Sequence, residues 1–213
     1  MKIASVVLAS AVLSLGAFSL PARAQEMSFF ITSVGAGDGG NLGGLEGADA
    51  HCQKLAEAAG STGKTWRAYL STQAEGKRGD SARLRIGHGP WYNAAGELIA
   101  VDLDQLHILP NIYLRTALDE NGNRVKGRYD DVNQHDILTG TQEDGMAFWP
   151  WQEGDKTCSN WTSNNEGSAI VGHHDRHGGG NTSWNSAHAS RGCSPDALAS
   201  SGGAGLFYCF ATD

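Results

Sequence analysis

Apolar and polar positions divide the chain into an apolar leader and a series of helix-type and strand-type segments. An apolar run from Ile3 to Leu20 follows Lys2 and ends in the segment Ala22-Arg23-Ala24. A charged start, a short apolar stretch and a small-x-small end are typical of a secretory signal peptide. We therefore assign residues 1–24 to a signal peptide. Residues 25–213 are expected to form one mature domain, because their length suits a single core.

The clearest element of the mature chain is an amphipathic helix predicted over residues 45–59. Its apolar positions recur at steps of three and four residues and include Cys52, which therefore faces the core. Gly60 follows at the position where a helix C-cap is expected. A predicted strand over residues 28–34 and a glycine-rich loop over residues 35–44 precede this helix.

Shorter segments predict strands, hairpins and short helices, from alternation, β-branched residues and turn residues. The expected elements are strands over residues 65–71 and 206–211, hairpins around residues 94–96 and 119–123, and short helices within residues 72–85 and from Asp102 to near His107. Within the first of these strands, Tyr69 is expected on the polar side. Residues 140–204 are expected to be mostly loop, and long loops often form binding surfaces.

Composition and charge narrow the class of protein. The chain has 29 glycines, 40% hydrophobic residues and a net charge of −7. Glycine at about twice its usual share indicates a loop-rich fold. The acidic charge argues against nucleic acid and anionic membranes as partners, because both attract basic surfaces. These patterns favour a secreted or periplasmic α+β protein without a membrane span.

All four cysteines lie downstream of the predicted signal peptide, at positions 52, 158, 193 and 209. An even number of cysteines in a secreted chain is expected to form disulfides, because the compartment is oxidising. Four cysteines allow three connectivities, and their spacing alone does not choose among them.

The order of these cysteines resembles that of the C-type-lectin-like superfamily. One cysteine lies on the first helix, a long gap precedes the second, Trp184-Asn185 precedes the third, and the fourth lies on the final strand. The resemblance implies an α+β fold with a mixed antiparallel sheet, flanking helices and a long loop region pinned by a disulfide. It also implies the pairings Cys52–Cys209 and Cys158–Cys193.

The likeness extends to the endostatin-type branch of this superfamily, as a bacterial secreted domain. The similar segments are residues 43–71, 90–98, 155–161 and 192–210. Calcium-binding members carry a Glu-Pro-Asn or Gln-Pro-Asp triplet and a Trp-Asn-Asp segment. Here the triplet is absent and Ser186 replaces the aspartate, which removes oxygen ligands that Ca²⁺ prefers. No segment after Gln25 matches the histidine-containing zinc segment of endostatin.

Tryptophans and amides within residues 140–204 suggest a carbohydrate site, because indole faces stack on sugar rings and amides bind hydroxyls. The tryptophans in question are Trp149, Trp151, Trp161 and Trp184, and the alternative is that each one belongs to the core. Trp184 is favoured because polar residues surround it. The expected ligand-binding residues are Trp184, Asn185, Asn164, Glu166, His174 and Asp175. Asn164 and Glu166 also suit a simple turn.

A histidine-rich segment provides a candidate metal site. His173, His174, Asp175 and His177 offer three imidazoles and a carboxylate within five residues, a donor set that suits a transition metal. Ca²⁺ is the second candidate ion, because some members of the family that the chain resembles bind calcium. The alternative is a solvated loop, because glycines flank the segment and disfavour a helix there.

No motif for enzyme chemistry is present: there is no Gly-x-Ser-x-Gly, no His-Glu-x-x-His and no phosphate-binding glycine loop. We therefore expect a secreted non-enzymatic recognition protein that binds carbohydrate through residues 140–204, in which oligomerisation could supply avidity. The alternatives are a module of the same fold that binds a secreted or surface protein, and a metal-binding or metal-dependent protein that uses residues 173–177.

Overall fold

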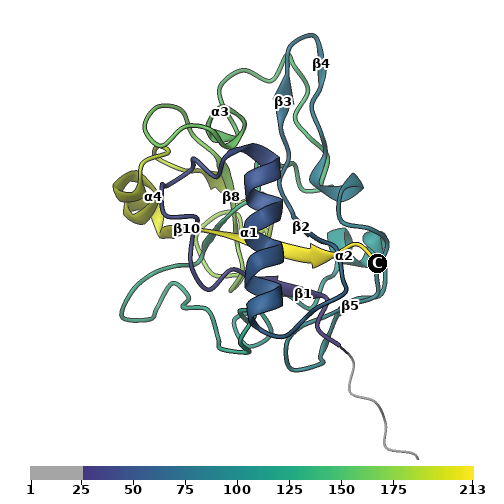
Figure 1. Cartoon of the computed structure of the whole chain (residues 1–213). Coiled ribbons are helices and arrows are strands. Elements are labelled where there is room, and N and C mark those ends of the chain that lie inside the picture. The colour runs from purple at the N-terminus through teal and green to yellow at the C-terminus, as the bar shows by residue number, and fades with distance from the viewer. Residues whose placement is uncertain (1–25) are drawn as a thin grey trace, which may run out of the picture.

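The nine-residue strand β10 (Gly203–Ala211) lies at the centre of the computed structural model, which describes residues 26–213. The predicted signal peptide, residues 1–24, lies outside the described residues. The architecture is mixed α+β, with small sheets and two disulfides. Figure 1 shows β10 running across the molecule with helix α1 (Gly44–Ala58) packed over it.

Six strands form the main sheet, in the order β1-β10-β7-β8-β9, and β2 also pairs with β10. The pairing of β7 with β10 is parallel and the other pairings are antiparallel, so the sheet is mixed as expected. The bounds are Phe29–Ile31 for β1, Trp66–Ala68 for β2, Asp136–Leu138 for β7, Ile170–His173 for β8 and His188–Ala189 for β9.

Both faces of β10 are buried, because successive side chains enter two separate clusters of the core. Phe207 and Cys209 pack in the cluster that α1 covers. Tyr208 and Phe210 point the other way, into a cluster rich in aromatic rings that includes Trp184. The period of two along β10 therefore divides the core into two halves.

The disulfide Cys52–Cys209 joins α1 to β10 and confirms the first pairing that the family resemblance implied. The helix itself confirms the prediction over residues 45–59, with bounds shifted by one residue. Gly60 has a φ of 87° and donates its N–H to the carbonyl oxygen of Glu57, which caps the helix as expected.

The second disulfide, Cys158–Cys193, is also the one implied, and it joins two distant loop segments. Cys158 begins the short element α3 (Cys158–Trp161), in which all four residues have φ between 46° and 66°. A left-handed turn of this kind costs about 1–2 kcal/mol per residue. The disulfide, the buried Trp161 ring and its Nε1–H bond to the Ser71 carbonyl hold this turn in place.

Several smaller elements match the sequence-based expectations. The hairpin around residues 94–96 is formed by β5 (Trp91–Tyr92) and β6 (Leu98–Ala100). Helix α2 (Leu103–Ile108) begins where the Asp102 side chain accepts a hydrogen bond from the Gln105 N–H. Around residues 119–123 the chain forms a turn closed by an isolated antiparallel bridge between Leu118 and Arg124, and Asp119 also bridges Ile31 of β1.

Other elements were not expected. Residues 72–85 contain the unexpected hairpin of β3 (Gln73–Ala74) and β4 (Lys77–Arg78), followed by the 3₁₀ turn η1 (Ala82–Leu84), which lies where a short helix was predicted. The hairpin projects beyond the sheet in Figure 1. Residues 140–204 hold β8, β9 and α3, and also α4 (Pro195–Ser201). These strands are two to four residues long, which is too short for alternation to distinguish them from loop.

Two further observations bear on where the protein functions. Two disulfides suit a protein of an oxidising compartment. Across residues 26–213, no helix has the length and apolar character that crossing a bilayer requires.

Candidate functional site

Trp184 and Asn185, the favoured ligand-binding residues, are both buried. The indole of Trp184 is 2% exposed and packs on the rings of Tyr69 and Tyr208, with centroid distances of 4.9 and 5.1 Å. Such a ring belongs to the core and offers no free face to a sugar. The carbonyl oxygen of Trp184 accepts a hydrogen bond from the Tyr208 hydroxyl at 2.7 Å, which ties this segment to β10.

Asn185 is the first residue of a buried hydrogen-bond chain. Its Nδ2 donates to the Tyr69 hydroxyl at 2.9 Å, and that hydroxyl lies 2.8 Å from Nε2 of His107. Because Nδ1 of His107 faces the Leu103 carbonyl oxygen, Nδ1 carries the proton and Nε2 accepts from Tyr69. Burial lowers the pKa of His107 and raises that of Tyr69, so both groups stay neutral.

A polar pocket of about 270 Å³ borders this hydrogen-bond chain, and Trp184 and Asn185 form part of the pocket lining. Arg176 and Glu143 supply charged groups at the same pocket. Arg176 is held by bonds to the carbonyl oxygens of Ile112 and Thr182. Arg176 and Asn185, two of the polar groups of this pocket, therefore already form hydrogen bonds with the protein.

Asn164 and Glu166, also expected at the ligand site, are exposed and do not line this pocket. The Asn164 Nδ2 donates to Oδ1 of Asp38 at 2.7 Å, and the Glu166 carbonyl oxygen accepts from the Ser163 hydroxyl. The bond between Ser163 and Glu166 closes a local turn, which is the alternative that the sequence left open, and Asn164 joins this turn to the distant loop of Asp38.

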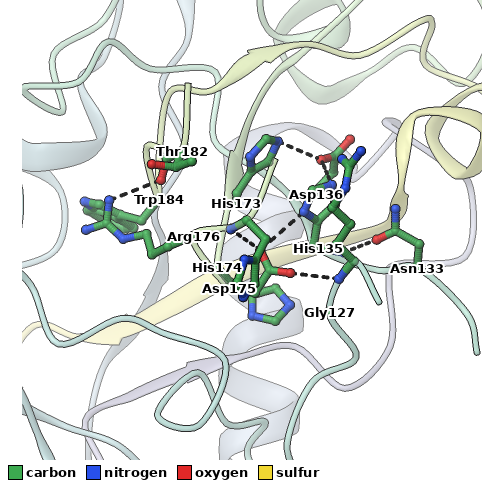
Figure 2. A network of polar contacts seen from close by, with 12 residues as sticks. Gly127, Asn133, His135, Asp136, His173, His174, Asp175, Arg176, Thr182 and Trp184 are labelled. Atoms are coloured by element: carbon green, nitrogen blue, oxygen red, sulfur yellow. Dashed lines mark hydrogen bonds and ion pairs between the residues drawn. The ribbon is translucent and has the colours of Figure 1, made fainter. Parts of the chain in front are cut away.

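The histidine-rich segment does not gather around one point. His174 is buried, its Nε2 faces the Lys126 carbonyl oxygen at 3.1 Å, and burial lowers its pKa to about 4. His177 is exposed and its ring lies against Tyr129. Of the four residues expected to bind a metal, only His173 directs a ring nitrogen to a shared polar centre (Figure 2).

That centre is the carboxylate of Asp136, which the sequence analysis did not single out. Oδ1 of Asp136 lies 3.2 Å from Nε2 of His135, 3.3 Å from Nε2 of His173 and 3.5 Å from Nε2 of His188. His135, Asp136 and His173 offer ligand atoms that all lie within 4.8 Å of one another, so this group could hold a metal ion. We name His135, Asp136, His173 and His188 the Asp136 cluster.

Strand register explains why these residues meet. Asp136 on β7 is directly opposite His173 on β8, and His188 on β9 is opposite Val171, two positions from His173 on the same face. Gly172 lies between Val171 and His173 on β8 and must be glycine, because a Cβ there would collide with the carbonyl oxygen of Trp184. Asp136 on β7 and His173 on β8 are about 40 residues apart in the sequence. The histidine-rich segment around His173 therefore gave no indication of this cluster.

Charge is concentrated at the Asp136 cluster. Burial alone would raise the pKa of Asp136, but its contacts with the imidazoles of His173 and His188 outweigh burial and hold the pKa at about 2. The same contact raises the pKa of His188. Asp175, predicted as a ligand, instead lies behind His135, with its Oδ1 3.3 Å from Nδ1 of that ring.

Two other tryptophans of the same region are exposed. Trp149 is 39% and Trp151 is 69% exposed, and their rings stack with a centroid distance of 4.7 Å and an interplanar angle of 11°. The guanidinium of Arg78 lies 3.8 Å from the Trp149 centroid. Arg78 and Trp151 cannot both pack on the same face of the Trp149 ring, so they lie on opposite faces. The three groups therefore form a stack with Trp151 at its open end.

The stack is fixed by its backbone contacts. Trp149 and Gln152 exchange two hydrogen bonds that close the turn carrying Trp151. Gln73 on β3 accepts from the Lys156 N–H at 2.7 Å and donates through Nε2 to the Gly154 carbonyl oxygen. The hairpin that carries Arg78 is thus fastened to the loop that carries the tryptophans.

Comparison with known proteins gives no relative: no protein-family model matches the chain, and no curated protein sequence matches it. The function must therefore be inferred from the residues of the chain itself.

Proposed function

We propose that this is a secreted or periplasmic, non-enzymatic recognition protein that binds carbohydrate through the Trp149–Trp151 stack. The observation that carries the proposal is the 69% exposure of Trp151 at the open end of a fixed aromatic stack. Exposed indoles are uncommon unless they serve binding, because burying a tryptophan is strongly favourable.

The chemistry of the stack suits a sugar ring. An indole face packs on the apolar face of a pyranose, and flanking polar groups bind its hydroxyls. Arg78, Gln152 and Glu153 lie at or beside the stack and supply such polar groups. The surface is open, so affinity for one sugar should be weak, and several copies would increase it by avidity.

We further propose that the fold is C-type-lectin-like. Two features support this: the disulfide that joins the first helix to the last strand, and the second disulfide that pins residues of the long loop region. Both tryptophans of the proposed site lie within residues 140–204, the loop region where the sequence pattern predicted ligand binding. The site uses Trp151 in place of Trp184, because the ring of Trp184 is enclosed.

A glycan array with the full mature chain and two variants tests the proposal. The wild type should bind a subset of glycans in buffer containing a calcium chelator, and Trp151→Ala should lose at least tenfold in apparent affinity. Tyr129→Ala is the matched control, because Tyr129 is an aromatic residue that is 79% exposed outside residues 140–204. Equal binding by wild type and Trp151→Ala, or no glycan bound by the wild type, would contradict the proposal.

A further inference from the structure

We propose that the Asp136 cluster (His135, Asp136, His173 and His188) is a binding site for one divalent transition-metal ion, with Zn²⁺ as the best match. This site is separate from the tryptophan stack and does not depend on carbohydrate binding. It also differs from the sequence-based candidate at residues 173–177, with which it shares only His173.

The distances from the Asp136 carboxylate to its three imidazoles match those between neighbouring ligands of one zinc ion. Zinc bonds to nitrogen and oxygen at about 2.0–2.2 Å in a tetrahedron, so neighbouring ligand atoms lie about 3.3–3.6 Å apart. The three contacts of Asp136 Oδ1 with imidazole Nε2 atoms measure 3.2, 3.3 and 3.5 Å. Three imidazoles and a carboxylate form a donor set that Zn²⁺ commonly uses.

Hydrogen bonds on the outer side of two rings leave their inner nitrogens free to coordinate. Nδ1 of His135 lies 3.3 Å from the Asp175 carboxylate, and Nδ1 of His188 lies 3.0 Å from the Ala189 carbonyl oxygen. Both partners are acceptors, so the tautomer with the proton on Nδ1 leaves Nε2, which faces Asp136, as the atom that would bind a metal ion.

Asp175 lies behind His135, on the side of the ring that faces away from Asp136. Its Oδ2 accepts from the Arg128 N–H at 2.7 Å and its Oδ1 accepts from the His177 N–H at 3.0 Å, so the carboxylate that orients His135 is itself fixed. A carboxylate behind a metal-binding histidine sets its tautomer and its orientation, and this arrangement is common at metal sites.

The buried polar atoms of the cluster lack the hydrogen bonds that they need. Asp136 is 1% exposed, and neither of its carboxylate oxygens forms a hydrogen bond with suitable angles among residues 26–213. The same holds for Nε2 of His135 and for both ring nitrogens of His173. Leaving such groups without partners is costly, and a bound cation would satisfy several of them together.

Binding requires a small adjustment, and solvent reaches one side of the cluster. The rings of His135 and His173 stack at a centroid distance of 4.2 Å with an interplanar angle of 16°, so their nitrogen lone pairs lie in nearly parallel planes. One ring must tilt for both nitrogens to face one ion. The side chain of His188 is 40% exposed and gives the ion a path from solvent. A bound ion would then join β7, β8 and β9 at their ends.

Zinc binding is tested on the full mature chain, purified without a histidine tag and stripped with a chelator. Titration with ZnCl₂ against a competing chromophoric chelator gives stoichiometry and affinity, and Co²⁺ in place of zinc reports tetrahedral coordination through its visible spectrum. The wild type should bind one Zn²⁺ per chain. His173→Gln should lose at least 100-fold in affinity, and Asp175→Asn should lose about 10–100-fold, as outer-shell variants do.

His177→Gln is the matched control, because His177 is exposed in the same segment and lies outside the cluster. It should bind zinc as the wild type does. If His173→Gln fails to fold, His188→Gln decides the question, because this half-exposed side chain can be replaced with little effect on the core. The proposal is overturned if the stripped wild type binds no zinc, if His188→Gln binds as the wild type does, or if His177→Gln loses as much affinity as His188→Gln.

Discussion

Replacing Trp184 by alanine separates a core tryptophan from a ligand-binding one. The ring is 2% exposed and contacts Tyr69, Tyr208 and, at a centroid distance of 6.0 Å, His107. Its Nε1 has no hydrogen-bond partner among the described residues, so the substitution removes packing and no side-chain hydrogen bond. The backbone carbonyl that accepts from Tyr208 remains in the variant.

The expected loss of unfolding free energy is about 3–5 kcal/mol, the usual cost of truncating a buried tryptophan. Trp151→Ala is the matched control, because it makes the same chemical change at a ring that is 69% exposed. That variant loses chiefly one stacked pair with Trp149, which contributes at most about 1.5 kcal/mol. The two variants should therefore differ by about 1.5 kcal/mol or more.

Urea unfolding of both variants and the wild type, with the disulfides intact, measures this difference. Tryptophan fluorescence and far-UV circular dichroism should give coincident transitions, which would support a two-state treatment. Losses that agree within about 1 kcal/mol would refute the assignment of Trp184 to the core and of Trp151 to the surface.

Two further results are expected from the covalent and titratable groups. The two disulfides close loops of 157 and 35 residues, so the chain-entropy treatment gives a cost of about 5 kcal/mol for removing Cys52–Cys209 and about 4 kcal/mol for removing Cys158–Cys193. A lower melting temperature for the Cys158→Ala, Cys193→Ala variant than for the Cys52→Ala, Cys209→Ala variant would contradict this order. Because burial lowers the pKa of His107, its neutral form stabilises the fold above the unfolded-state pKa of about 6.5, and stability should fall as the pH drops below that value. His107→Gln should show a smaller fall in unfolding free energy over this range, and an unchanged or steeper fall would disprove the reasoning.

Sequence patterns predicted the elements that are long or carry strong local signals. The amphipathic repeat and Gly60 located α1, and β-rich composition located β1 and β10. The disulfide pairing required the family resemblance, because spacing alone left three connectivities. The strands of the loop region were missed, since elements of two to four residues are stabilised by their neighbours in the sheet and leave little trace in local sequence.

The candidate sites show the same limit. Trp184 has polar neighbours in the sequence, a pattern that resembles a binding surface. In the structure, however, the Asn185 amide points inward and bonds to Tyr69, and the indole of Trp184 packs in the core against the Tyr69 ring. The histidine-rich segment contained one member of the Asp136 cluster, because strand β8 ends at His173 and the residues after it turn away. His135 and Asp136 carry no local motif, and only the pairing of β7 with β8 brings them to His173.

We propose that Trp151, at the open end of the Trp149–Trp151 stack, contacts the ligand. The most direct measurement follows the indole N–H signals in ¹H–¹⁵N correlation spectra while a glycan identified on the array is added. The signals of Trp151 and Trp149 should shift in proportion to occupancy, while those of the buried Trp161 and Trp184 stay in place. Shifts confined to the buried indoles, with Trp151 unchanged at saturation, would contradict the account.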